Sequence, residues 1–127
     1  MSAQFTISVD PARHLVRIAM SGFFTPEDVT RFVRERAVAH QQLRCGPNQH
    51  VTINDLRAMK VQPQDTVATF GAVLSDPRYR SRKLAFVVSK TLARSQLGRA
   101  LAGRDARCFE TVAEAELWAL ADAARAA

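Results

Sequence analysis

The sequence of 127 residues has little of what several classes of protein require. Its two cysteines, Cys45 and Cys108, are too few for a disulfide framework, and neither belongs to a Cys-x-x-Cys pair. No apolar run approaches the ~20 residues that a membrane-spanning helix needs. The N-terminus leads directly into a strand pattern, without the charged and then apolar segments of a signal peptide. We therefore expect a cytoplasmic protein without a transmembrane segment.

The sequence also lacks the common signatures of catalysis. Its five glycines form neither a phosphate-binding loop nor a dinucleotide fingerprint, and no Gly-x-Ser-x-Gly elbow occurs. His14, His40 and His50 do not have the spacing of a metal site, and Asp55 has no obvious second carboxylate for acid–base chemistry. We expect no enzymatic activity, no metal and no cofactor, although an unrecognised enzyme that uses Asp55 stays a third possibility.

Charge is what the sequence has in excess, with 18 basic against 12 acidic residues and a net charge of +6. Nearly all the basic residues are arginines spread along the chain, which, with abundant alanine, is typical of a GC-rich bacterial genome. The densest run, Arg78–Lys83, includes Tyr79, a residue type on which nucleic-acid bases stack. No nucleic-acid-binding motif accompanies it, so we interpret the run as solvated charge and expect no nucleic-acid partner.

Strand-like and helix-like segments alternate along most of the chain. Alternating apolar residues on either side of the turn Asp10–His14 predict a β-hairpin. Helix start signals then separate the remaining elements. They are a helix from Pro26 to before Gly46-Pro47, a strand Val51–Ile53 ending at Asn54–Leu56, a helix from Pro63 to Ser75, a strand Leu84–Val88, a helix from Thr91 to Gly103, a strand Ala106–Phe109 and a final helix after Thr111.

This order predicts one α/β domain spanning residues 1–127. The elements follow the sequence β-β-α-β-α-β-α-β-α. Because crossovers between parallel strands are right-handed, we expect a mixed, mostly parallel five-stranded sheet with helices on both faces. An apolar fraction of 47% is sufficient for an ordinary core.

Four segments at the joins resemble the SpoIIAA-like branch of the STAS (anti-sigma-factor antagonist) domains, which is related to the CRAL-TRIO lipid-transfer fold. They are Gly22 ahead of Thr25-Pro26-Glu27-Asp28, the strand end Val51–Leu56, the strand Arg82–Val88, and the stretch from Phe109 to Trp118 with Thr111 and Glu114 as a capping box. The resemblance covers about Phe5 to Leu120. It implies a binding domain, most plausibly a regulatory protein–protein interaction module. The lipid-transfer kinship implies an alternative, a small carrier or sensor of a lipid-like or anionic ligand.

The resemblance also implies a phosphorylation site. Antagonist members carry a phosphorylatable serine after an aspartate, at the start of the helix that follows the third strand. The nearest match is Asp65-Thr66, so Thr66 is the candidate. The simpler interpretation is that both are ordinary first-turn residues, where the helix dipole favours an acid.

The carboxyl ends of parallel strands, near helix N-termini, are where open α/β sheets bind ligands or partners. This edge predicts a candidate face formed by Thr25, Asp55, Arg57, Lys90 and Thr91. Backbone amides with Arg57 and Lys90 would suit an anionic group. A structural interpretation is also open, in which Asp55 and Thr91 cap a loop and a helix.

Overall fold

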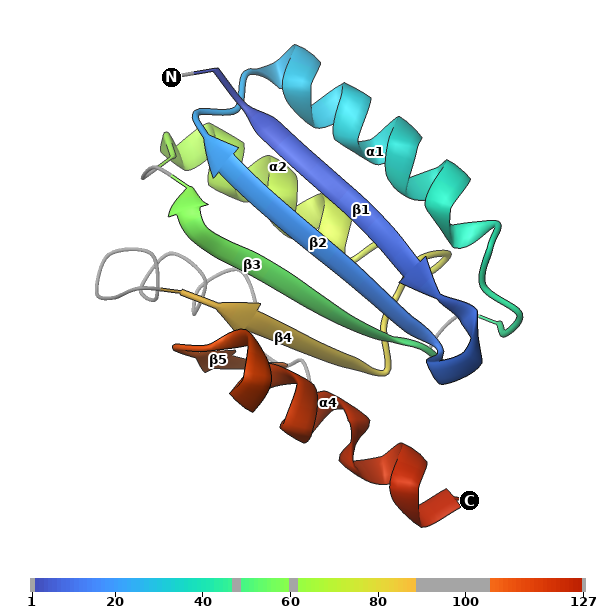
Figure 1. The fold of residues 1–127 in the computed structure, drawn as a ribbon. Coiled ribbons are helices and arrows are strands. Elements are labelled where there is room, and N and C mark those ends of the chain that lie inside the picture. Colours follow the sequence, from blue (N-terminus) through green and yellow to red (C-terminus); the bar gives the residue numbers. More distant parts are fainter. Residues whose placement is uncertain (1, 47–48, 60–61, 89–105, 127) are drawn as a thin grey trace.

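The computed structural model describes residues 2–46, 49–59, 62–88 and 106–126, which form one five-stranded sheet (Figure 1). The strands lie in chain order, β1-β2-β3-β4-β5. β1 and β2 are antiparallel, and the pairs from β2 to β5 are parallel. Their bounds are β1 Gln4–Asp10, β2 Leu15–Gly22, β3 Val51–Met59, β4 Lys83–Val87 and β5 Ala106–Phe109, with a 3₁₀ turn at Pro11–Arg13. The predicted hairpin and mixed sheet are confirmed.

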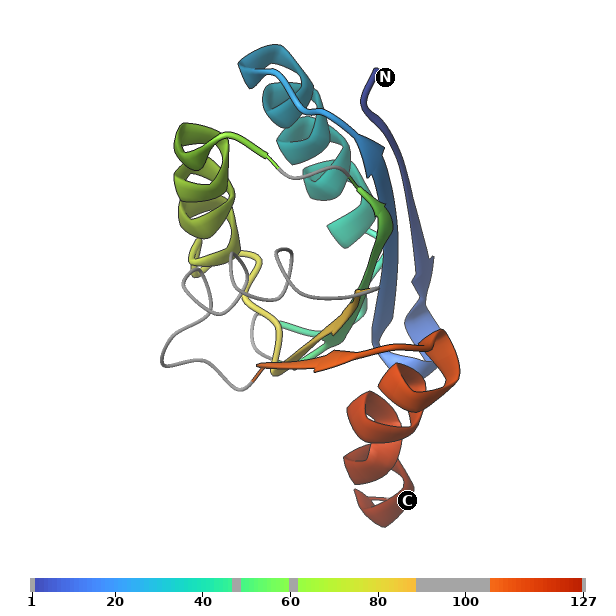
Figure 2. The ribbon, with the colours of Figure 1, turned by 90° about the vertical axis from the view of Figure 1, so that its left-hand side faces the viewer.

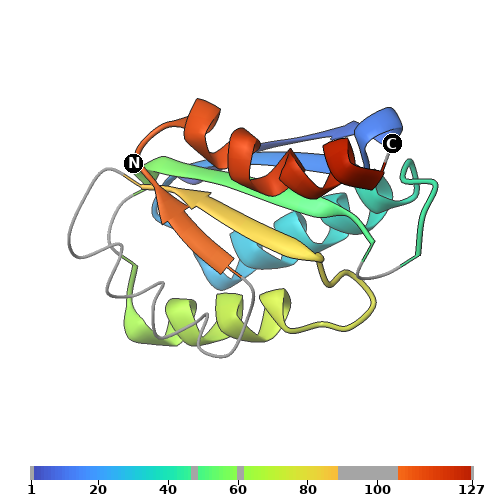
Figure 3. The ribbon, with the colours of Figure 1, turned by 90° about the horizontal axis from the view of Figure 1, so that it is seen from below.

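Helices cover both faces of this sheet, as predicted. α1 (Pro26–His40) and α2 (Gln64–Leu74) lie side by side on one face (Figure 2), and α4 (Val112–Ala126) lies on the other (Figure 3). Right-handed crossovers that always step to the next strand place α1 and α2 on the same side. The expected helix from Thr91 to Gly103 lies outside the described residues. None of the described helices is long and apolar enough to cross a membrane.

One predicted boundary is confirmed and another is wrong. The first helix ends at His40, before Gly46 as predicted, because the amides of Gln41, Gln42 and Leu43 bond three residues back and the helix tightens. The third strand runs on to Met59 instead of ending near Leu56. Its second half places the charged Asp55 and Arg57 among the core residues Leu56 and Met59, and its pairing with β2 shifts register there, so neither an apolar run nor a clean alternation marks the strand.

Four phenylalanine rings fill the space beneath α1 and α2. Phe5 and Phe32 meet edge to face with ring centroids 5.4 Å apart, and Phe24 and Phe70 do so at 5.5 Å. Phe32 also lies 6.2 Å from Phe70, so one ring contact network links both helices to the strands. Aromatic pairs in these geometries add to the stabilisation from burial.

The opposite face is covered over only part of its width. α4 packs Ala115 and Ala119, both fully buried, on the strand residues Leu15, Val51, Ile53, Ala85 and Val87. Two small residues let the helix approach the sheet closely. Along β1 and β2 the outward residues Gln4, Thr6, Ser8 and Ala19 are exposed instead. This uncovered part of the sheet is called the open face below.

Candidate functional site

The structure divides the predicted face between two sides of the molecule. Thr25 and Thr66 lie at the starts of α1 and α2, on the face of the sheet that these two helices cover. Asp55 and Arg57 lie on β3 and continue the row of Val51 and Ile53, which point to the α4 side. Lys90 and Thr91 lie outside the described residues. The described members therefore do not form one site.

Thr25 closes a capping box. Its hydroxyl oxygen accepts the amide of Asp28 at 3.2 Å, while the Asp28 carboxylate accepts the Thr25 amide at 2.9 Å. The Thr25 amide and the Thr25 hydroxyl both donate to the Asp28 carboxylate and hold its pKa below the ordinary value. Pro26 occupies the first helical position, where a missing amide hydrogen costs nothing. The side chain of Thr25 therefore begins α1, and its hydroxyl is already engaged.

Asp55 and Arg57 form a two-pronged ion pair within β3. The Arg57 guanidinium donates to the two carboxylate oxygens of Asp55 at 2.9 and 2.7 Å. The side-chain hydrogen bond from Arg57 holds the pKa of Asp55 below its ordinary value. Asp55 is thus an ionised, partnered carboxylate on a strand, and the expected position in a loop after the strand is wrong because β3 continues to Met59.

Thr66 lies in a groove between the N-terminal halves of α1 and α2. The groove holds about 370 Å³ and is called the α1–α2 groove. Thr66 is only 9% exposed, and its backbone amide donates to the Asp65 carboxylate at 2.9 Å. The lining combines valine side chains with threonine hydroxyls and comprises Pro26, Val29, Thr30, Val33, Asp65, Thr66, Thr69 and Val73.

A buried glutamine sets how the starts of the two helices lie relative to each other. Gln62, just before α2, accepts the amide of Phe24 at 2.9 Å and donates to the carbonyl of Gly22 at 2.9 Å. Gly22 has a φ of 81°, which glycine adopts without strain. Sequence reasoning missed Gln62, because its partners lie 38 and 40 residues earlier in the chain.

A second cluster that sequence reasoning missed lies at the C-terminal end of α1. It consists of Arg36, His40, His50 and Tyr79 and is called the histidine cluster. The His40 ring lies at right angles to those of His50 and Tyr79, with centroids 4.8 and 5.1 Å away. The Arg36 guanidinium lies 4.5 Å from the centre of the Tyr79 ring and donates to the carbonyl of Val73 at 2.9 Å.

Burial keeps both imidazoles of the histidine cluster neutral. Desolvation first, and then the nearby Arg36 charge, lowers the pKa of His40 to about 4. Desolvation, His40 and Arg36 lower the pKa of His50 to about 4 as well. His50 is fully buried and its Nε2 lies 3.2 Å from the hydroxyl of Ser81. Among the described residues, no group of three or more His, Cys, Asp or Glu side chains is arranged to hold a metal ion.

The basic run 78–83 is largely committed to contacts within the protein. Arg78 bonds both carboxylate oxygens of Asp76, and Lys83 donates to the carbonyl of Trp118 at 2.9 Å. The half-buried Tyr79 ring packs against His40 and the Arg36 guanidinium in the histidine cluster. Both cysteines are half-buried, and Cys108 lies on β5 at the edge of the sheet.

A search against known family models and a search of curated proteins found no match to this chain. A solved structure does match, with a TM-score of 0.68, 12% sequence identity and coverage of 94% of this chain and 96% of the other. It is an uncharacterised protein of the DUF3478 family from Shewanella loihica PV-4, described as having a SpoIIAA-like fold. The fold of the present chain is SpoIIAA-like. At this identity the match shows the fold and says nothing about function.

Proposed function

We propose that this chain is a regulatory protein–protein interaction module without catalytic activity, and that the α1–α2 groove is its contact surface. The groove itself carries the proposal. It is open to solvent, and its lining includes half-buried Val33 and Val73. Thr30 and Thr69 are exposed beside them; their hydroxyls donate to the carbonyls of Pro26 and Asp65 and can still accept hydrogen bonds. Protein contacts commonly combine an apolar centre with a polar rim.

The packing beneath the groove supports the same function. A lipid carrier needs an apolar pocket of several hundred Å³, for which the space beneath α1 and α2 is a natural place. In the described residues that space holds the four phenylalanine rings, with Phe24 and Phe32 at 3% and 4% exposure. A partner that binds in the groove needs no rearrangement of this core.

The position of Thr66 supports a regulatory role for the groove. A phosphate on Thr66 would add about two negative charges beside Asp65, in the lining of the contact surface. The α2 N-terminus favours a negative charge, whereas the neighbouring carboxylate opposes it. Because Thr66 is only 9% exposed although it lines the groove, a kinase reaches its hydroxyl only when α1 and α2 move apart. We propose that phosphorylation at Thr66 switches partner binding off.

The proposal is tested by comparing two arginine variants of equal size and charge. Thr30→Arg fills the groove, and Ala113→Arg places the same side chain on an exposed position of α4. Proteins retained from a lysate of the natural host by the wild-type chain are identified, purified and titrated against both variants. We expect Thr30→Arg to raise the dissociation constant about tenfold or more, and Ala113→Arg to leave it unchanged.

Native and denaturing mass spectra of the chain from its own host complete the test. A covalent phosphate that disappears in Thr66→Val supports the switch. A small molecule lost on denaturation would instead favour the carrier. A partner that binds Thr30→Arg as tightly as the wild type would contradict the groove as contact surface.

A further inference from the structure

The two edges of the described sheet differ in length and in charge. β5 offers four residues, and one of them is the exposed Arg107. β1 offers seven, and the stretch from Gln4 to Val9 has no charged side chain. β1 also pairs with β2 in an unbroken register, without a bulge. Edge strands usually carry a charge, a proline or a bulge that prevents further pairing, and β1 has none of these before Asp10.

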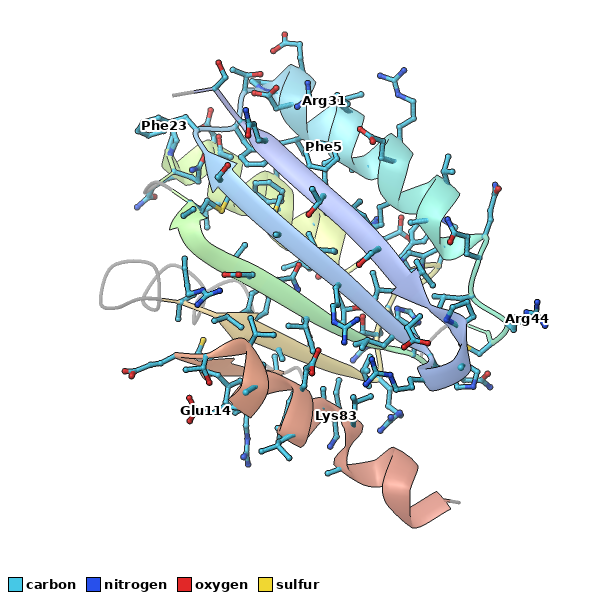
Figure 4. The ribbon with its side chains drawn as sticks, viewed as in Figure 1. Phe5, Phe23, Arg31, Arg44, Lys83 and Glu114 are labelled. Carbon is cyan, nitrogen blue, oxygen red and sulfur yellow. The ribbon has the colours of Figure 1, made fainter. Side chains whose placement is uncertain are left out.

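The outer edge of β1 borders a hollow. This hollow of about 890 Å³ is lined by Gln4, Phe5 and Thr6 of β1 and by Arg31 and Glu35 of α1, and it extends over β2 to the Asp55–Arg57 ion pair on β3. Figure 4 shows Arg31 and Phe5 together at this edge, and the guanidinium lies 5.1 Å from the centre of the ring. In the described residues, the outer side of β1 pairs with no strand. A second β-strand is the group that matches such a row of backbone donors and acceptors.

We propose that the occupant is a second copy of this chain, and that two β1 strands pair antiparallel to form one sheet across a twofold axis. A pairing centred on Ile7 puts Phe5 opposite Val9 and Thr6 opposite Ser8. Phe5, Ile7 and Val9 pack toward α1, whereas Thr6 and Ser8 are exposed on the open face. The alternation is therefore self-complementary, since like faces continue across the axis.

The charges near the edge do not oppose a second copy, despite the net charge of +6. β1 contributes no repulsion between Gln4 and Val9. Arg31 and Glu35 have opposite signs and share one helical stripe with Val38, which is 60% exposed. Because the two signs alternate on this stripe, the part of α1 beside the β1 edge carries no net charge.

The proposed pairing leaves the α1–α2 groove accessible in both copies. Thr30 and Val33 line that groove with residues of α2, whereas Arg31 and Glu35 line the hollow beside β1. The two surfaces therefore lie on different sides of α1. A dimer formed through β1 would present two grooves, one from each copy.

Sedimentation analysis of the purified chain over a wide range of concentrations tests the proposal. We expect a reversible dimer in the wild type. The double variant Thr6→Lys/Ser8→Lys puts like charges opposite each other on both sides of the axis. It should raise the dimer dissociation constant about tenfold or more. Ala19→Lys, which puts the same charge on the same face but on β2, should leave the dimer intact.

Hydrogen exchange of the unmodified protein provides a readout that depends on no substitution. The β1 amides should exchange more slowly at high than at low protein concentration, while α4 amides do not change. Far-ultraviolet circular dichroism checks that the variants fold. A wild-type chain that is monomeric at every concentration overturns the proposal. So does a dimer that persists in the double variant or shows no concentration-dependent protection of β1.

Discussion

The two faces of the sheet differ although they are built from the same strands. On the side of α1 and α2, the inward residues of β1 and β2 meet a network of aromatic rings. On the other side, α4 covers β3 to β5, and the outward residues of β1 remain polar and exposed. The strict alternation of β1 and β2 thus produces a filled face and a free face. We expect the β1 and β2 side chains under α1 and α2 to contribute much more to stability than those on the open face.

The largest expected effect tests this contrast directly. Phe32→Ala removes a ring that contacts Phe5 and Phe70, and should lower the free energy of unfolding by about 3–5 kcal/mol. Thr6→Ala, across the same strand pair on the open face, should change it by less than about 0.5 kcal/mol. Urea unfolding of both variants measures the difference. Equal losses would show that the two faces do not differ as described.

A smaller effect comes from the histidine cluster. In the folded protein the pKa of His40 and of His50 is lowered to about 4, whereas an unfolded chain binds these protons near pH 6.5. The free energy of unfolding should therefore fall as the pH drops from about 6.5 to 4, by roughly 1–3 kcal/mol after solvent screening. Below about pH 4 both histidines are protonated in the folded and the unfolded chain, so they should cause no further change in the free energy of unfolding.

Urea unfolding at a series of pH values measures this dependence. His50→Gln should flatten the profile between pH 6.5 and 4, since one of the two depressed groups is removed. His14→Asn changes an exposed histidine in the hairpin turn and serves as the matched control. A profile that His50→Gln leaves unchanged would contradict neutral, buried imidazoles.

The smallest effect concerns the boundary between the covered and open parts of the second face. Arg17 of β2 donates to Glu116 of α4 at 2.5 Å, and both side chains are partly exposed. Glu116→Gln should cost about 0.2–1 kcal/mol, as is usual for such pairs, and less at high salt. Thermal unfolding at two salt concentrations detects it. A loss comparable with that of Phe32→Ala would mean that α4 depends on this pair and not on Ala115 and Ala119.

Features set by nearby residues were predictable from the sequence. The hairpin follows from alternation around Asp10–His14, and the helix starts at Thr25 and Thr111 follow from an acid three residues after each threonine. The order of strands follows from the order of these signals. The predicted resemblance to a SpoIIAA-like fold rests on the same local signals, and the match to a solved structure confirms it.

Features set by distant residues were not predictable. His40 and His50 are joined by a loop that gives no sign of their contact, and Gln62 bonds partners far back in the chain. Asp55 and Arg57 were expected in a loop, because charged side chains in the second half of β3 obscure its alternation. A single sequence shows residue types and spacing, whereas these contacts depend on how the elements pack.

The central claim is that the regulatory partner contacts the α1–α2 groove. Photocrosslinking within the native complex tests this claim most directly. A photoreactive amino acid at Thr69 lies in the α1–α2 groove, and one at Ser21 lies on the open face. The account predicts crosslinks to the partner from Thr69 and none from Ser21. Crosslinks from Ser21 alone would place the partner on the open face and contradict the account.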